Sequence, residues 1–145
     1  MASFDVVRRT VLSAEEAWSR LTDWERHGEF LPLTTVRLAD GPRTGAGTAF
    51  VARTSLGPLG FDDAMEVTVW QPPAGSAPGR CHITKHGGVV VGSAQLSVAA
   101  APDGAFVNWH EEARFRAAGR LLDWPNRVIG EIVFGRLVDG LLADA

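Results

Sequence analysis

Glu111 is the residue of this chain whose type and position are best suited to chemistry. It lies in a run of alternating side chains that predicts a strand, and the alternation turns it to the same side as Trp109 and Ala113. Apolar surroundings disfavour an ionised carboxylate, so the pKa of Glu111 should rise unless a cation pairs with it. Such a group can orient a ligand hydroxyl or carbonyl, or act as a general acid or base. The alternatives are a bulge that turns Glu111 outward and a buried ion pair with a structural role.

Lys85 and Asp63 are two further ionisable residues expected on the inner side of a sheet. If the strand that ends at Trp70 pairs with the one that begins at Arg80, so that these two residues are opposite, Met65 faces Lys85 and Asp63 is its diagonal neighbour. A Lys85–Asp63 salt bridge near a cavity rim would follow, and it would hold the polar end of a ligand. A solvated rim pair of little energetic value is the alternative.

The other reactive residue types do not form a recognisable site. His82 and His86 are four residues apart, but in a strand that spacing is roughly 13 Å, which is too far for one metal ion. His27 is expected to be exposed on a short helix. Cys81 is the only cysteine, so the chain can form neither an internal disulfide nor a cysteine-based zinc cluster. No G-x-S-x-G elbow occurs, and we expect neither a metal nor a cofactor.

The composition limits the classes of partner. The chain has 145 residues, the usual size of one domain, and we predict a single domain over residues 1–145. The formal net charge is −3 and the sequence has no basic run, which argues against nucleic acid as a partner. The longest run of low charge, residues 89–102, is too short to cross a bilayer, so we expect no membrane insertion. No secretory signal is recognised, and the expected location is the cytoplasm.

Apolar alternation and turn residues predict the elements that position these side chains. A strand over residues 4–12 is followed by a helix that Ser13 caps, with Glu16 reaching back to the Ser13 backbone amide. A second short helix is expected over residues 24–31, before a proline. Six further strands are expected over residues 34–39, 47–55, 61–70, 80–86, 89–101 and 105–116.

Gly87-Gly88 has the composition of a two-residue hairpin turn. If this dipeptide is the loop, His86 opposes Val89 and Ile83 opposes Gly92. Residues that oppose one another point to the same face of a sheet. The turn therefore assigns inner and outer side chains to two consecutive strands.

Asp103-Gly104 is a second dipeptide of hairpin composition, and as the loop it places Leu96 opposite Glu111. The two turns together separate the side chains of three strands into an apolar face and a polar face. The apolar face collects Cys81, Ile83, Lys85, Val90, Gly92, Ala94, Leu96, Val98, Ala100, Val107, Trp109, Glu111, Ala113 and Phe115. The polar face collects His82, Thr84, His86, Ser93, Gln95, Ser97, Asn108, His110, Glu112 and Arg114.

The C-terminal part of the sequence predicts one long helix that covers the apolar face. Gly130, Gly135 and Gly140 within it either leave room for a ligand or let the helix pack closely on the sheet. The expected apolar stripe consists of Leu121, Val128, Ile129, Ile132, Val133, Leu137, Val138, Leu141 and Leu142.

This order of one strand, two short helices, six strands and a long helix resembles the START and birch-pollen-allergen-like superfamily, also called SRPBCC or polyketide cyclase/dehydrase. The resemblance implies an α+β helix-grip fold, in which a curved seven-stranded antiparallel sheet with two short helices wraps around one long C-terminal helix. It also implies a deep cavity for lipids, polyketides or other apolar compounds, without one defined reaction. The residues that carry it are Leu12-Ser13-Ala14-Glu15-Glu16-Ala17-Trp18, Gly45-Ala46-Gly47, Trp70-Gln71-Pro72-Pro73, and Asp103-Gly104 leading into Val107-Asn108-Trp109.

Three functions stay open at this point. The first is non-catalytic binding of a small hydrophobic molecule between the sheet and the helix. The second is a polyketide cyclase or dehydratase in which Glu111 is the catalytic acid or base. The third is a protein-interaction module, with a homodimer as one form. The expected ligand-binding residues are Phe30, Asp63, Met65, Ile83, Lys85, Leu96, Val98, Trp109, Glu111, Phe115 and Ile132.

Overall fold

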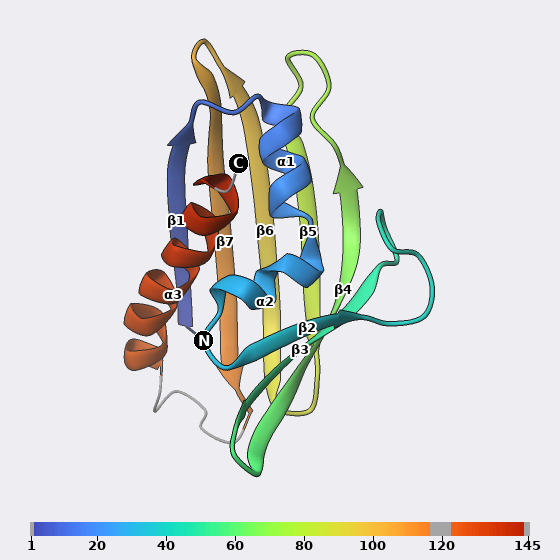
Figure 1. The fold of residues 1–145 in the computed structure, drawn as a ribbon, viewed down its shortest axis with the longest axis vertical. Helices are drawn as coiled ribbons and strands as arrows, with labels where there is room; N and C mark the ends of the chain where they lie inside the picture. Colours follow the sequence, from blue (N-terminus) through green and yellow to red (C-terminus); the bar gives the residue numbers. More distant parts are fainter. Residues whose placement is uncertain (1, 117–122, 144–145) are drawn as a thin grey trace.

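A curved antiparallel sheet dominates the computed structural model, which describes residues 2–116 and 123–143 (Figure 1). Within the described residues the sheet has seven strands, in the spatial order β1-β7-β6-β5-β4-β3-β2. The predicted fold class, a seven-stranded antiparallel sheet with short helices and a long C-terminal helix, is confirmed. The strands are β1 (Ala2–Thr10), β2 (Thr34–Leu38), β3 (Ala49–Leu56), β4 (Leu59–Gln71), β5 (Gly79–His86), β6 (Val90–Ala101) and β7 (Gly104–Phe115).

The helices lie on the concave side of this sheet. Helix α1 (Ala14–Leu21) begins where the capping pattern predicts it, and the Ser13 hydroxyl accepts a hydrogen bond from the Glu16 amide at 3.1 Å. The second helical segment consists of a 3-10 turn, η1 (Trp24–Arg26), that continues into α2 (His27–Phe30). The long helix is α3 (Asp123–Ala143).

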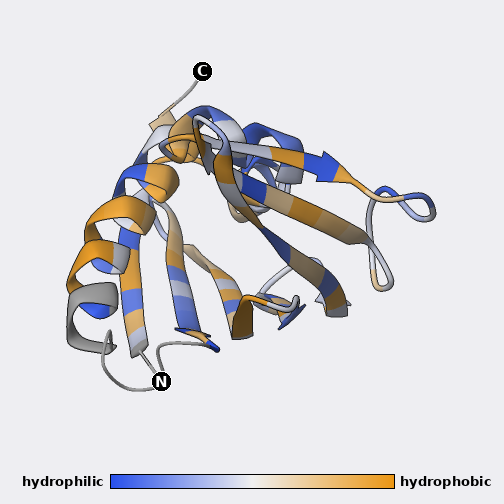
Figure 2. Cartoon of the chain, turned by 90° about the horizontal axis from the view of Figure 1, so that it is seen from below, coloured by the Kyte–Doolittle hydropathy of each residue, from blue (hydrophilic) through white to orange (hydrophobic). Residues whose placement is uncertain are grey.

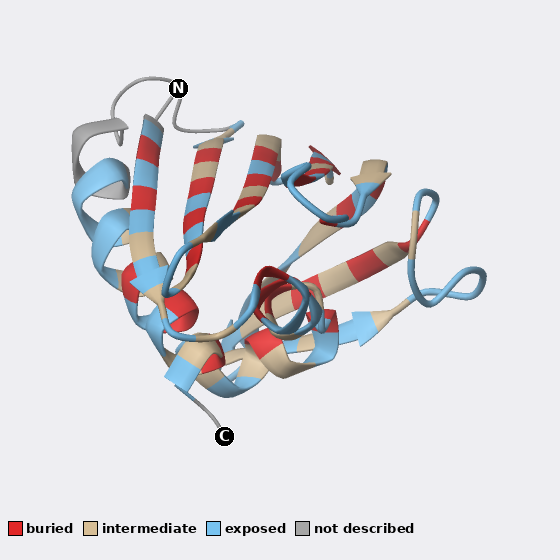
Figure 3. Cartoon of the chain, turned by 90° about the horizontal axis from the view of Figure 1, so that it is seen from above, coloured by how far each residue is buried: buried red, intermediate tan, exposed pale blue. Residues whose placement is uncertain are grey.

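Side chains along the central strands alternate between buried and accessible positions (Figure 3). In β5 every second residue is buried, from Gly79 to Lys85, and β7 buries Ala105, Val107, Trp109 and Glu111 in the same way. The inner and outer faces predicted from the sequence are therefore confirmed for these strands. This alternation turns Glu111 and Lys85 toward the helices.

The register of the β5–β6 hairpin differs from the prediction by two residues. His86 pairs with Val91 and Ile83 with Ala94, so Gly87-Gly88 is part of a longer loop. A shift of two residues moves no side chain to the other face, because the period of a strand is two. Apolar patterning therefore could not choose between the two registers.

The β6–β7 hairpin is also shifted by two residues. Ala101 pairs with Gly104 and Leu96 with Trp109, which makes Pro102-Asp103 the turn. Gly104 is a strand residue with a φ of 151°, and a Cβ there would overlap the carbonyl oxygen of Thr10 in β1. This glycine is needed for the close approach of a neighbouring strand and not for the turn.

Strands β4 and β5 pair as predicted at one end only. Met65 opposes Lys85, as expected, but Trp70 opposes Cys81 and not Arg80. The difference arises from a β-bulge between Val67 and Val69, which adds one residue to β4. Residues beyond the bulge are therefore displaced by one position relative to β5.

Helix α3 packs against β1 and also contacts α1 and α2. Apolar residues occupy much of its length (Figure 2), but burial is unequal, because Leu137, Val138 and Leu141 are fully buried whereas Ile129 and Ile132 are 58% and 54% exposed. Leu121, expected in the apolar stripe, lies outside the described residues. None of the helices in the described ranges is long and apolar enough to cross a membrane.

The glycines of α3 serve close packing at two positions. A Cβ on Gly130 would overlap the ring of Phe4 in β1, and a Cβ on Gly140 would overlap the ring of Phe30 in α2. Of the two alternatives open from the sequence, close contact therefore holds at Gly130 and Gly140. The absence of a side chain at these two positions allows α3 to pack closely against β1 and α2.

Candidate functional site

A cavity of about 340 Å³ lies between the concave face of the sheet, the η1–α2 segment and the N-terminal half of α3. Most of its wall is apolar, and every strand of the sheet contributes to it. The apolar lining residues include Phe4, Trp24, Leu31, Val36, Phe50, Ala52, Phe61, Met65, Ile83, Val90, Ala94, Trp109, Phe115, Ile129, Val133 and Phe134.

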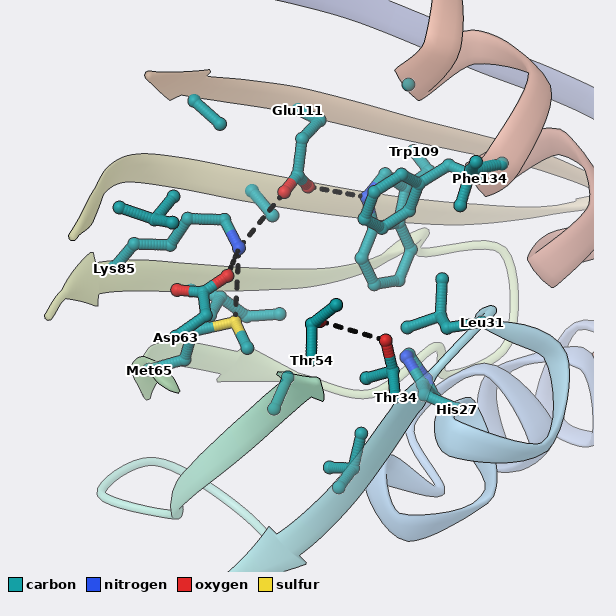
Figure 4. Close-up of a pocket in the computed structure, with 18 of the residues that line it drawn as sticks. His27, Leu31, Thr34, Thr54, Asp63, Met65, Lys85, Trp109, Glu111 and Phe134 are labelled. Atoms are coloured by element: carbon teal, nitrogen blue, oxygen red, sulfur yellow. Dashed lines mark hydrogen bonds and ion pairs between the residues drawn. The ribbon is translucent and has the colours of Figure 1, made fainter. Parts of the chain in front are cut away.

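A buried group of three charged residues forms the polar part of this wall (Figure 4). Lys85 Nζ on β5 lies 2.7 Å from Asp63 Oδ2 on β4 and 3.2 Å from Glu111 Oε1 on β7. The other Glu111 oxygen, Oε2, accepts a hydrogen bond from Trp109 Nε1 at 2.9 Å. Lys85 Nζ also lies 3.3 Å from the sulfur of Met65. Three strands thus supply one connected polar group inside an apolar cavity.

Burial changes the protonation chemistry of this group. Desolvation raises the pKa of Glu111, although the Lys85 ammonium and the Trp109 hydrogen bond oppose the change. Desolvation alone would lower the pKa of Lys85, but the negative charges of Glu111 and Asp63 outweigh it and raise that pKa. Lys85 is therefore protonated at neutral pH. The predicted inward orientation of Glu111 is confirmed, and so is the Lys85–Asp63 contact, whose side chains are 5% and 14% exposed.

His27 is a second ionisable residue in the wall, and the expectation that it is exposed is wrong. Its side chain is 6% exposed, and Nε2 lies 2.9 Å from the Leu21 carbonyl oxygen. The ring packs between Trp24 and Trp109, with centroid distances of 5.4 and 5.7 Å. Burial lowers the pKa of His27 to about 4, so the imidazole is neutral near pH 7.

A pair of threonines completes the polar lining near α2. Thr34 Oγ1 lies 2.8 Å from the Pro32 carbonyl oxygen and 2.9 Å from Thr54 Oγ1, which comes from the neighbouring strand. Because a carbonyl oxygen only accepts, the Thr34 hydroxyl donates to Pro32 and the Thr54 hydroxyl donates to Thr34.

Seven of the residues predicted to contact a ligand line the cavity: Asp63, Met65, Ile83, Lys85, Trp109, Glu111 and Phe115. The other four do not. Leu96 and Val98 are fully buried in β6, a strand that also contacts α1, and neither borders the cavity. Phe30 packs against α3 at Gly140, and Ile132 is 54% exposed on α3.

Sequence analysis missed several residues that line the cavity. His27, Thr34, Thr54 and Phe134 are the clearest examples. Gly28, next to His27, is the one residue in the sequence that could have indicated that His27 is buried. A Cβ on Gly28 would lie 3.2 Å from the Thr34 carbonyl oxygen and the Val36 amide, so α2 approaches β2 closely. Periodicity alone does not detect such a contact.

The remaining reactive groups of the described residues do not add to this site. No cluster of three or more histidine, cysteine, aspartate or glutamate residues there could hold a metal ion. Cys81 is buried, and desolvation raises the pKa of its thiol to about 12, so it carries no thiolate at neutral pH.

No protein-family model and no curated protein sequence matches the chain. Solved structures do, and one is TTHA0849 from Thermus thermophilus, with 14% identity, a TM-score of 0.74, and coverage of 97% of this chain and 94% of that one. A fragment of the STAR-related lipid transfer protein from Xanthomonas axonopodis matches with 16% identity, a TM-score of 0.65, and coverage of 96% and 85%. A point mutant of norcoclaurine synthase from Thalictrum flavum, in complex with a transition-state analogue, matches with 10% identity, a TM-score of 0.62, and coverage of 97% and 94%.

These identities are too low to transfer a ligand or a reaction, but the matches extend over nearly the whole chain. The resemblance predicted from the sequence is confirmed for the fold. The chain has the same helix-grip fold as these solved structures.

Proposed function

We propose that the chain binds a small, mainly apolar molecule in the cavity between the sheet and α3. The observation that carries this proposal is a cavity of about 340 Å³ with an apolar wall and a buried group of charges formed by Lys85, Asp63 and Glu111. Ligand pockets are typically about 300–1,000 Å³ in volume, and a few convergent polar groups fix the orientation of the bound molecule. The charged group has that role in this proposal.

The structural neighbours support the proposal that the cavity binds a molecule. The Xanthomonas protein is described as a lipid transfer protein, and the Thalictrum enzyme holds a transition-state analogue. Both share the fold with this chain at low sequence identity. Because one fold carries many functions, the chemistry of this cavity, and not the likeness, is the basis of the proposal.

We propose binding and not catalysis, because the cavity and its charged group are sufficient for binding, whereas catalysis by Glu111 also needs a reacting proton within hydrogen-bond reach of one of its oxygens. Each oxygen of Glu111 has one partner in the wall, Lys85 Nζ at 3.2 Å or Trp109 Nε1 at 2.9 Å, and can accept one further hydrogen bond. The cyclase or dehydratase therefore stays a prediction, in which Glu111→Gln abolishes turnover and spares binding. The interaction module and the homodimer also stay predictions, which light scattering tests.

Native mass spectrometry of the freshly purified chain tests the binding proposal. We expect a retained small molecule on the wild-type protein and none on Ala94→Leu, because Ala94 is buried in the cavity wall next to Glu111. The matched control is Gln95→Leu, which places the same side chain on the exposed outer face and should keep the molecule.

Titration with an uncharged fluorescent dye such as Nile red gives a second readout if the molecule is lost during purification. We expect binding to the wild type and to Gln95→Leu, and weakened binding to Ala94→Leu. Dye binding that is equal in all three proteins, together with masses that show no retained molecule, would refute the proposal, because the cavity would then not be where apolar molecules bind.

A further inference from the structure

We propose that the ligand carries a hydrogen-bond donor, a hydroxyl or an amine, at the end that meets Lys85, Asp63 and Glu111, and that the cavity discriminates against carboxylates. This inference rests on the proposed function and adds the chemical class of the ligand. It follows from a count of donors, acceptors and charges in the wall.

The ammonium of Lys85 already has three close partners in the wall. An ammonium has three N–H donors, and Lys85 Nζ has three neighbours that accept, namely Asp63 Oδ2 at 2.7 Å, Glu111 Oε1 at 3.2 Å and the Met65 sulfur at 3.3 Å. An anionic ligand that approached Lys85 would have to displace one of the two carboxylates. The carboxylates belong to the chain and are already positioned by the fold, so they compete for the Lys85 ammonium better than the carboxylate of a free ligand.

Acceptors in the same group exceed donors. Each carboxylate oxygen can accept two hydrogen bonds, but Glu111 receives one from Lys85 and one from Trp109. Asp63 receives one from Lys85 on Oδ2, and its Oδ1 is buried without any hydrogen-bond partner among the described residues. A ligand that brings a donor relieves this shortage, whereas a ligand that brings only acceptors does not.

The charge balance of the buried group points the same way. Two carboxylates face one ammonium, and desolvation raises the pKa of Glu111, with the neighbouring charge of Asp63 adding to this rise. A third carboxylate would add repulsion in a medium that screens charge weakly. Arg114 also borders the cavity, but its side chain is exposed to solvent, where its charge is screened.

The other polar side chains of the wall also present acceptors. The proton of His27 is on Nε2, because Nε2 contacts the Leu21 carbonyl oxygen, and this leaves Nδ1 of the neutral ring as an acceptor. The hydroxyl hydrogens of Thr34 and Thr54 are both used within the wall. Trp24 Nε1 is a donor with no hydrogen-bond partner in the described part of the chain, but the atom is buried and neutral, so it cannot balance a charge.

A matched set of naphthalenes tests the inference on the full wild-type chain by isothermal titration calorimetry. The members carry a methyl, methoxy, hydroxymethyl, aminomethyl or carboxylate group at the same ring position. We expect the hydroxymethyl or the aminomethyl compound to bind at least about tenfold more tightly than both the methoxy compound and the carboxylate. The two donor compounds separate the sources of the preference, because only the amine adds a positive charge.

Asp63→Asn and Asp62→Asn are the variants that locate the effect. Asp63→Asn removes one buried charge and adds donors, so it should reduce the preference for the amine over the carboxylate by about tenfold or more. Asp62 is its neighbour on the outer face, where it pairs with Arg53 near the surface. Asp62→Asn should leave the preference unchanged.

The outcomes separate this inference from the proposed function. Tight binding of the methyl compound with equal or tighter binding of the carboxylate overturns the inference and leaves the binding function standing. Failure of every member, including the methyl compound, to bind the wild type overturns both. An unchanged preference in Asp63→Asn overturns the assignment of the donor end to this group.

Discussion

At the scale of single residues, the buried ammonium of Lys85 is the group on which the polar wall depends. Lys85 is 7% exposed and Glu111 is 2% exposed, so neither can exchange its partner for water. Removal of one member of a buried ion pair is strongly destabilising, because the charge left behind is uncompensated. Removal of one partner should therefore change the free energy of unfolding by more than the intact pair contributes to it.

Lys85→Met should destabilise the protein by about 3–5 kcal/mol in urea denaturation at neutral pH, because it leaves two carboxylates facing each other in the cavity wall. The double variant Lys85→Met/Glu111→Gln should lose clearly less than the single variant, because it removes one of those charges together with the lysine. A single-variant loss below about 1 kcal/mol would show that the three side chains do not interact as a buried group.

His27 predicts a dependence of stability on pH. The pKa of His27 is about 4 in the folded protein, whereas the ordinary pKa of a histidine is 6.5, so the unfolded chain binds the proton more tightly. Its contribution is present above pH 6.5 and is lost as the pH falls through about 4, with a total of about 3 kcal/mol. His27→Gln should flatten the fall in stability between these pH values in chemical denaturation. Identical slopes in the two proteins would contradict the assignment.

At the scale of elements, two glycines of the sheet are required by neighbouring strands and not by turns. Gly92 in β6 has a φ of 144°, and a Cβ there would overlap the carbonyl oxygen of Glu112 in β7. Gly104 stands in the same relation to Thr10 in β1. These close approaches allow the strongly curved sheet to keep its ladder hydrogen bonds.

Gly92→Ala should therefore destabilise the fold by about 2 kcal/mol or more, because the new methyl group meets backbone atoms and the backbone conformation disfavours L side chains. Gly88→Ala in the preceding loop is the matched control, since a Cβ there meets no atom within 4 Å. We expect that control to change the free energy of unfolding by no more than about 0.5 kcal/mol. Equal effects of the two substitutions in thermal denaturation would count against the close approach at Gly92.

At the scale of the whole molecule, the cavity exists because the two ends of the concave face are covered differently. Helix α1 packs on β6 and β7 (Figure 1), and Leu96 and Val98 of β6 are buried outside the lining of the cavity. Toward the other end, the N-terminal half of α3 and the η1–α2 segment border the concave face without filling it, and the cavity opens there. The sheet supplies a continuous apolar surface, and the position of the helices decides which part of it a ligand can reach.

Residue patterning along the chain is enough to predict which side chains of the strands face inward. Alternation has a period of two, so the face of Glu111, Lys85 and Met65 was predicted correctly although both hairpin registers were wrong by two residues. The Ser13 cap and the long C-terminal helix were equally local signals, carried by residue types at short spacing.

Only the tertiary structure decided which inward residues border empty space and which are packed. Leu96 and Ile83 have the same pattern in the sequence, but the first is buried away from the cavity and the second borders it. The burial of His27 and the bulge that shifts Trp70 likewise depend on contacts between distant segments. A void is a property of how elements pack against one another, and no period along the chain encodes it.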